Sequence, residues 1–178
     1  MKTSRTPGFV LALLYLFFLG YLTFSSGQLP DPVATHFDGS GQPNGWMSRF
    51  SHLLFMLVFG FAFPFLVVAA LYVVRFLPST FINIPRRDYW LAPERRADTF
   101  AWLFRHSLWF ACIGVSFITG IHYLIVRANA QPPAQLPTPL LLTLAGAFLA
   151  ALATWAIAMI QHFRRTAGHP TECAKPEA

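Results

Sequence analysis

The side chains best suited to chemistry in this sequence are three of its six histidines, His36, His52 and His122. Asp31 and Asp38 lie in the same polar stretch as His36. Imidazole nitrogens with a nearby carboxylate suit zinc or copper, so one hypothesis is a metal site formed where the three rings converge. The spacing contains no tight pattern such as His-x-x-x-His, which would place two rings on one helix face. The competing interpretation treats each histidine as a separate polar or interfacial residue.

Motifs of known enzyme classes are missing. The chain has neither Gly-x-Ser-x-Gly nor His-Glu-x-x-His. A calcium loop starting at Asp38 would need Gly and Glu where Pro43 and Arg49 stand. Ser48, His52 and Asp38 have the residue types of a catalytic triad, but only their proximity in the sequence supports one. A triad is recognised by its geometry, which the sequence does not give. We therefore expect a protein that is not an enzyme and that uses no cofactor.

The composition is that of a membrane protein. Of 178 residues, 55% are hydrophobic and 11% are charged, whereas soluble domains carry roughly 25% charged residues. Four stretches approach the about 20 apolar residues that a membrane helix needs. They predict spans at about residues 8–26, 52–77, 102–126 and 139–161. The expected fold is all-α, a polytopic membrane protein with four transmembrane helices in a single integral membrane domain, residues 1–178.

The first span has an alternative interpretation. Lys2 and Arg5 precede it, and the small residues Ser25, Ser26 and Gly27 follow it. This order also describes a cleaved signal peptide, although its apolar core is at or beyond the usual length of about 7–15 residues. Both interpretations leave the three later spans in place.

The polar loop at residues 27–51 is expected to form a small hairpin or cap on the membrane. Pro30 and Pro32 hold the backbone extended. Residues 33–37 alternate loosely between apolar and polar side chains, which favours a short strand. Asp38 and Gly39 form a strong turn dipeptide, and the ring of Trp46 suits the membrane–water boundary.

The second informative loop covers residues 78–101. Pro93 suits the first position of a helix, and Glu94 would lie near the positive end of the helix dipole. We expect one helix from Pro93 to Val126, beginning outside the hydrocarbon. Small residues recur every fourth position in the third and fourth spans, which predicts close packing of these two helices. These residues are Cys112, Ser116 and Gly120, and Gly146, Ala150, Thr154 and Ala158.

The basic residues predict the orientation. Eleven of the thirteen lie before the first span, between the second and third, or after the fourth, and Arg49 and Arg127 alone lie on the other side. The positive-inside rule then places both termini, the loop 78–101 and the tail 162–178 in the cytoplasm of a bacterial inner membrane. Arginines that flank membrane ends contact the lipid bilayer, so we expect no nucleic-acid partner.

Two sequence patterns resemble a known family. The loop LPDPVATHFDGSGQPNGW and the segment NIPRRDYWLAPERR are similar to the domain of unknown function that small bacterial membrane proteins share with SdpI-type immunity proteins. The matching residues are Pro30, His36, Gly41, Pro43, Trp46, Asn83, Pro85, Tyr89, Trp90, Pro93 and Glu94. The resemblance implies a role in protection against a membrane-active toxin, or in relaying its presence, although the SdpI-type members have additional spans.

These observations lead to one functional prediction and two alternatives. We expect a non-enzymatic binding or sensing protein, immunity-like in role, whose outer loop meets an extracytoplasmic peptide or another membrane protein. The alternatives are a metal-binding membrane protein that uses His36, His52 and His122, and a structural subunit of a membrane complex. The candidate contact residues are His36, Phe37, Asp38 and Trp46 outside, and Asn83, Tyr89, Trp90 and Glu94 inside.

Overall fold

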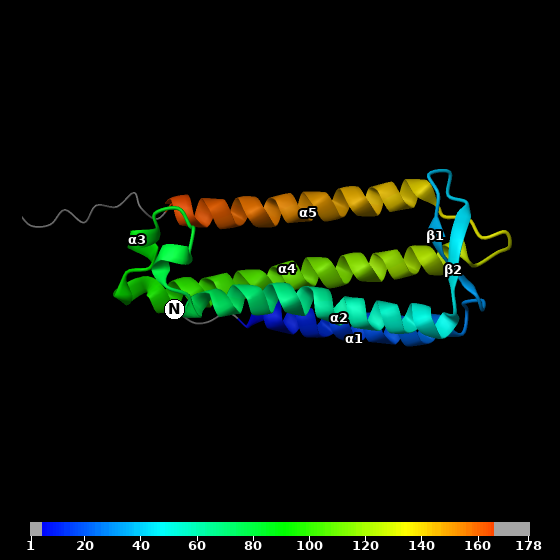
Figure 1. Ribbon diagram of the computed structural model, residues 1–178, viewed down its shortest axis with the longest axis horizontal. Coiled ribbons are helices and arrows are strands. Elements are labelled where there is room, and N and C mark those ends of the chain that lie inside the picture. The colour runs from blue at the N-terminus through cyan, green and yellow to red at the C-terminus, as the bar shows by residue number, and fades with distance from the viewer. Residues whose placement is uncertain (1–4, 166–178) are drawn as a thin grey trace, which may run out of the picture.

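The computed structural model describes residues 5–165, in which four long helices run side by side (Figure 1). These helices are α1 (Thr6–Ser26), α2 (Arg49–Val73), α4 (Pro93–Ala128) and α5 (Thr138–Arg165). An antiparallel hairpin of β1 (Val33–Phe37) and β2 (Pro43–Met47) joins α1 to α2. The 3-10 turns η1 (Val74–Phe76) and η2 (Ser79–Phe81) and the short helix α3 (Arg87–Trp90) join α2 to α4.

The predicted fold class is confirmed, since each of the four helices is long and apolar enough to cross a membrane. The strand expected at residues 33–37 is β1. The helix expected from Pro93 begins there and continues without interruption for 36 residues. The last helix runs to Arg165, so the predicted tail starts inside it, and residues 166–178 lie outside the described part of the chain.

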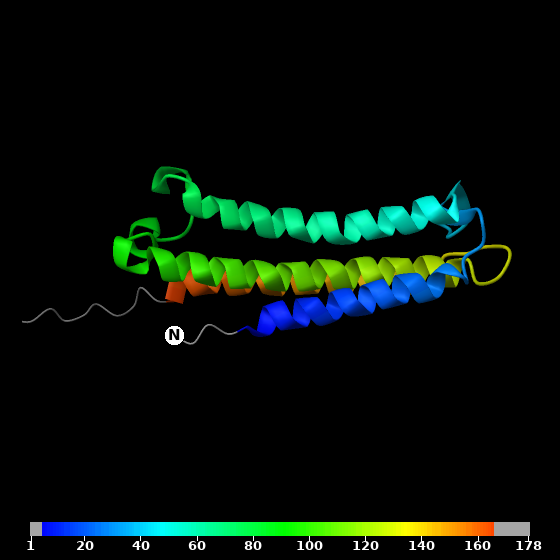
Figure 2. The ribbon, with the colours of Figure 1, turned by 90° about the horizontal axis from the view of Figure 1, so that it is seen from below.

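Helix α4 is the third of the four long helices along the chain, and it occupies the centre of the bundle. In Figure 1, α5 lies on one side of α4, and α1 and α2 overlap on the other. Figure 2, turned by 90°, shows α1 and α2 on opposite sides of α4, with α5 behind it. The main core joins Phe18 and Leu22 of α1 to Met56 of α2 and to Val115 and Ile118 of α4. Helices α1 and α2 pack more extensively on α4 than on each other. The bundle is therefore held together through one shared helix.

The expected packing of small residues between the last two spans is wrong for α5. Gly146, Ala150, Thr154 and Ala158 are all exposed, and a Cβ added at Gly146 would meet nothing within 4 Å. Aromatic side chains of α5 make the contact with α4 instead, among them Phe148 and Trp155. Their rings span a wider separation between the two helices than small side chains can. On α4, Gly120 alone matches the expectation, since a Cβ there would lie 2.7 Å from the Leu144 side chain of α5.

Five stacked rings fasten α5 to α4 and to α3, and we call them the ring ladder. Their order is Trp155, His106, Trp102, His162 and Trp90, with successive centroids 4.8, 4.6, 3.8 and 5.1 Å apart. Trp155 Nε1 donates to the carbonyl of His106, and His106 Nε2 lies 3.0 Å from the carbonyl of Trp155. Trp90 Nε1 completes the attachment by donating to a backbone carbonyl at the end of α5.

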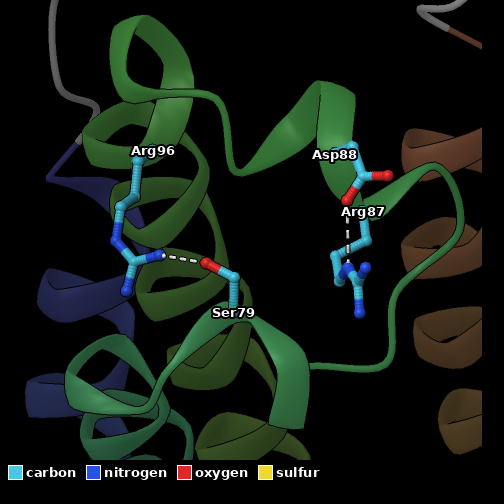
Figure 3. A network of polar contacts seen from close by, with 4 residues as sticks. All are labelled: Ser79, Arg87, Asp88 and Arg96. Carbon is cyan, nitrogen blue, oxygen red and sulfur yellow. Dashed lines mark hydrogen bonds and ion pairs between the residues drawn. The ribbon is translucent and has the colours of Figure 1, made fainter.

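The two ends of the bundle differ in chemistry. The hairpin end holds β1, β2 and the connector between α4 and α5 (Figure 1). The opposite, arginine-rich end holds η1, η2 and α3, together with the start of α4. There Arg96 donates to the hydroxyl of Ser79 (Figure 3). It also donates to the carbonyls of Arg75 and Leu77, which satisfies acceptors left free where α2 ends.

Candidate functional site

The backbone of the hairpin is clamped to the end of α4 by one amide side chain. Asn129 Oδ1 accepts the Ala34 N–H at 2.9 Å, and Asn129 Nδ2 donates to the Ala34 carbonyl at 2.9 Å. The same Nδ2 also donates to the Ile125 carbonyl of α4. Below this clamp, Leu29 and Val33 are buried against Ile125. The buried start of β1 is thus fixed to the helix that occupies the centre of the bundle.

The turn of the hairpin is fixed at a second point, on the connector between α4 and α5. The Leu136 N–H donates to the Gly41 carbonyl at 2.9 Å. Gly41 has φ +83°, and a Cβ at this position would lie 2.8 Å from the Leu136 carbonyl oxygen. Both the left-handed backbone and the close approach require glycine here. The hairpin therefore has little freedom to move away from the connector.

Beneath the hairpin lies a buried polar relay of three side chains from three helices. His52 of α2 faces His122 of α4, with Nε2 and Nδ1 3.2 Å apart and the rings stacked. His122 Nε2 lies 2.7 Å from the hydroxyl of Ser25 in α1. The edge of Tyr21 packs on the His122 ring. Ser25 and His122 are fully buried and His52 is nearly so, which makes these bonds costly to break.

One assignment of hydrogens satisfies all contacts of the relay with both rings neutral. The Ser25 hydroxyl donates to the Tyr21 carbonyl at 2.8 Å. It can then accept a proton from His122 Nε2, and His122 Nδ1 can accept one from His52 Nε2. The chain of donors thus runs from α2 through α4 to α1. In this arrangement Ser25 is an acceptor for the imidazole and not a nucleophile activated by it.

Two of the predicted contact residues are exposed on the hairpin, one on each strand. His36 is exposed and lies across from Gly45, where an added Cβ would be 3.0 Å from the His36 Cβ. Trp46 is 55% exposed. Phe37 instead packs partly against the buried cluster under the hairpin. The imidazole and the indole are therefore the groups that a partner could contact.

The side chain of Asp38 stabilises the turn of the hairpin. Its Oδ1 accepts the hydroxyl and the N–H of Ser40 and the N–H of Gln42. These hydrogen bonds, led by the one from the Ser40 hydroxyl, lower the pKa of the Asp38 carboxyl below its ordinary value. The stabilisation that this carboxylate gives to the turn is present at neutral pH and is lost as the pH falls through the lowered pKa.

The three histidines proposed as metal ligands do not assemble into one site. The structure brings His52 and His122 together, while His36 lies exposed on the hairpin. Within residues 5–165, no group of three or more His, Cys, Asp or Glu side chains is placed to hold a metal ion. The sequence predicted that the three histidines lie at the same end of the bundle. It did not predict that His52 and His122 are buried between helices while His36 is exposed on the hairpin.

The predicted contact residues at the arginine-rich end are dispersed. Trp90 is buried in the ring ladder, and its carbonyl accepts the hydroxyl of Thr99. Tyr89 is partly exposed beneath the guanidinium of Arg95, 4.0 Å from its centroid. Asn83 and Glu94 are exposed. These four residues hold the loop or face solvent, and the structure does not bring them to one site.

Sequence reasoning missed the residues that make the hairpin end rigid. Asn129 stood between the third span and the connector with no recognised motif, and Ser25 was considered only as an extension of the first span or as part of a cleavage site. One signal was available for Ser25, because a polar residue in a hydrophobic span needs a partner inside the bundle. No local pattern indicates that Asn129 pairs with Ala34, 95 residues earlier.

Among the comparisons with known proteins, one finds a match, and it covers the first part of the chain. No curated protein and no solved structure matches the sequence. Residues 10–61 match the model of a family described as Domain of unknown function (DUF1648). The matched residues comprise most of α1, the whole hairpin and the first half of α2. The segment that supplies Ser25, His52 and the clamped hairpin therefore matches this family of unknown function, which is consistent with the family resemblance of the loop sequence.

Proposed function

We propose that this chain is a non-enzymatic binding or sensing protein of a bacterial cytoplasmic membrane, whose hairpin receives a ligand from outside the cell. The observation that carries this proposal is the hairpin itself, which exposes His36 and Trp46 on a backbone held by Asn129 and Leu136. The ligand would be a peptide or another membrane protein, and an immunity-like role is one form of such binding.

The fixed backbone of the hairpin favours ligand binding for a thermodynamic reason. Ordering a mobile loop on binding costs free energy, and a loop that is already ordered avoids most of this cost. Exposed aromatic rings are the residues that most often dominate binding energy at protein interfaces. Trp46 is such a ring, and His36 adds a hydrogen-bonding group on the partner strand.

The relay supports a sensing role in addition to simple capture. Val33 of β1 packs on Ile125, which lies one helical turn from His122 on α4. A force on the hairpin is therefore applied close to the contact that joins α2, α4 and α1. The buried position of Ser25 and the direction of its hydroxyl favour binding over nucleophilic catalysis.

The proposed orientation can be measured by cysteine labelling in a Cys173→Ala background, since Cys112 is buried. Gly39 lies on the hairpin with nothing within 4 Å of an added Cβ, and Thr80 is exposed at the opposite end. In intact cells, an impermeant maleimide is expected to label Gly39→Cys and to label Thr80→Cys only after permeabilisation. The reverse pattern would place the hairpin inside and would overturn the proposal.

Recognition itself is tested by photocrosslinking in living cells. A photoreactive amino acid replaces His36 or Trp46, and the matched control replaces Phe24, a 73% exposed residue of α1. Both hairpin positions are expected to give one discrete adduct that Phe24 does not give. Gly41→Ala should weaken the adduct from Trp46, because it strains the turn and displaces the connector.

Two outcomes would overturn the recognition proposal. Absence of any adduct from either hairpin position, in protein shown to be inserted and folded, would remove the hairpin as a contact surface. The same adduct from Phe24 and from the hairpin would indicate a partner that covers the helix face, as expected for a structural subunit of a membrane complex.

A further inference from the structure

A groove at the arginine-rich end carries a charge that no carboxylate within the described residues balances. It has a volume of about 620 Å³ and lies between the end of α2 and the start of α4. Its two charged lining residues are Arg75 and Arg96. Within residues 5–165, the one ion pair is formed by Arg87 and Asp88. Two neighbouring guanidinium groups without an anion repel each other, more strongly at a membrane edge than in bulk water.

The two arginines differ in what they already bind. Arg96 uses its terminal nitrogens on Ser79 and on two backbone carbonyls, which are neutral acceptors (Figure 3). The guanidinium of Arg75 makes no hydrogen bond or ion pair within the described residues, and it lies over the rings of Tyr72 and Phe76. Its five N–H donors therefore remain available for a ligand with several acceptor oxygens.

The acidic residues nearest in sequence do not line the groove. The lining residues of α4 recur at helical spacing and so occupy one face. They are Pro93, Arg96, Ala97, Phe100, Ala101 and Phe104. Glu94 and Asp98 fall outside this face by the same spacing. The groove thus combines two cations with an otherwise apolar and aromatic lining.

We propose that this groove binds the phosphate of an anionic phospholipid between Arg75 and Arg96, with the lipid's acyl chain along Phe100 and Phe104. A phosphate offers oxygens that a guanidinium fork can bind in pairs. The apolar lining favours an amphipathic molecule over a soluble phosphate ester. The groove also lies where a membrane-spanning helix ends, at the depth of lipid headgroups.

The test compares two variants that remove the same charge from the same end of the protein. Arg75→Gln removes the free guanidinium of the groove, and Arg87→Gln removes one that already pairs with Asp88. Binding of dioleoyl phosphatidylglycerol and of dioleoyl phosphatidylcholine to the full chain in detergent is measured by native mass spectrometry. We expect tighter binding of phosphatidylglycerol, weakened about tenfold by Arg75→Gln and little changed by Arg87→Gln.

Three results would overturn the proposal. An equal loss in both variants would mean that general surface charge attracts the lipid. Equal affinity for the two lipids in the unaltered protein would mean that the groove does not recognise an anionic lipid. Competition by glycerol phosphate at the same concentration as the lipid would identify a soluble phosphate ester as the ligand. Thermal unfolding of both variants, without added lipid, confirms that each is folded.

Discussion

Replacing Trp102 with alanine is expected to lower the free energy of unfolding by about 4 kcal/mol, within the range for removing a large aromatic side chain from a core. The indole lies in the middle of the ring ladder, between His106 and His162. It also packs edge-on against Phe163. The loss leaves a gap at the contact that fastens α5 to α4. Equilibrium unfolding in mixed micelles measures the change.

The matched control is Trp109→Ala, which removes the same side chain from the same helix at a position that is 41% exposed. It is expected to cost less than half as much, because more of its side chain is exposed and it is not part of the ring ladder. A distance between spin labels at Phe104 and Ile160 should broaden in the Trp102 variant only. Equal costs and equal distance distributions would contradict the role given to the ladder.

Replacing His122 with alanine is expected to lower the free energy of unfolding by about 3 kcal/mol, which combines a cavity with the loss of two buried hydrogen bonds. The Ser25 hydroxyl keeps its bond to the Tyr21 carbonyl, but the facing nitrogen of His52 loses its partner. Tyr123→Ala is the neighbouring control, since Tyr123 is 42% exposed. That variant should change stability by less than about 1 kcal/mol.

A double-mutant cycle isolates the contact between the two histidines. Each ring is replaced by alanine alone and then both together, and unfolding is measured in the same micelles. We expect a coupling energy of about 1 kcal/mol, in the range seen for contacting residues and for hydrogen bonds between membrane helices. Additive costs would show that the two rings are stabilised independently and that the relay is not one unit.

The sequence predicted those parts of the fold that depend on local composition. Apolar length located the four helices, Pro93 located the start of the third, and the alternation after Pro32 located the first strand. Each of these signals acts within a few residues of the feature that it predicts. A membrane strengthens them, because every backbone polar group in the hydrocarbon must be paired within the protein.

The predictions that were wrong concern which face of a helix or strand packs against which neighbouring element. The small residues of α5 were expected at its interface, yet Gly146 faces open space and Trp155 makes the contact. Likewise, the metal hypothesis required His36 and His52 to converge, but His36 lies exposed on a strand of the hairpin while His52 is buried in the bundle. Such rotations depend on partners far away in sequence, and without those partners the spacing alone cannot resolve them.

The central place of α4 affects how the chain can be assembled during synthesis. Helices are inserted in chain order, so α1 and α2 enter the bilayer before the helix on which both of them pack. His122 follows His52 by 70 residues, which a ribosome translates in roughly 4 to 14 s at typical rates. During this interval Ser25 and His52 face the bilayer without their common partner. Until the third span arrives, His52 therefore lacks the partner that it has in the folded bundle, and the Ser25 hydroxyl can bond only within its own helix.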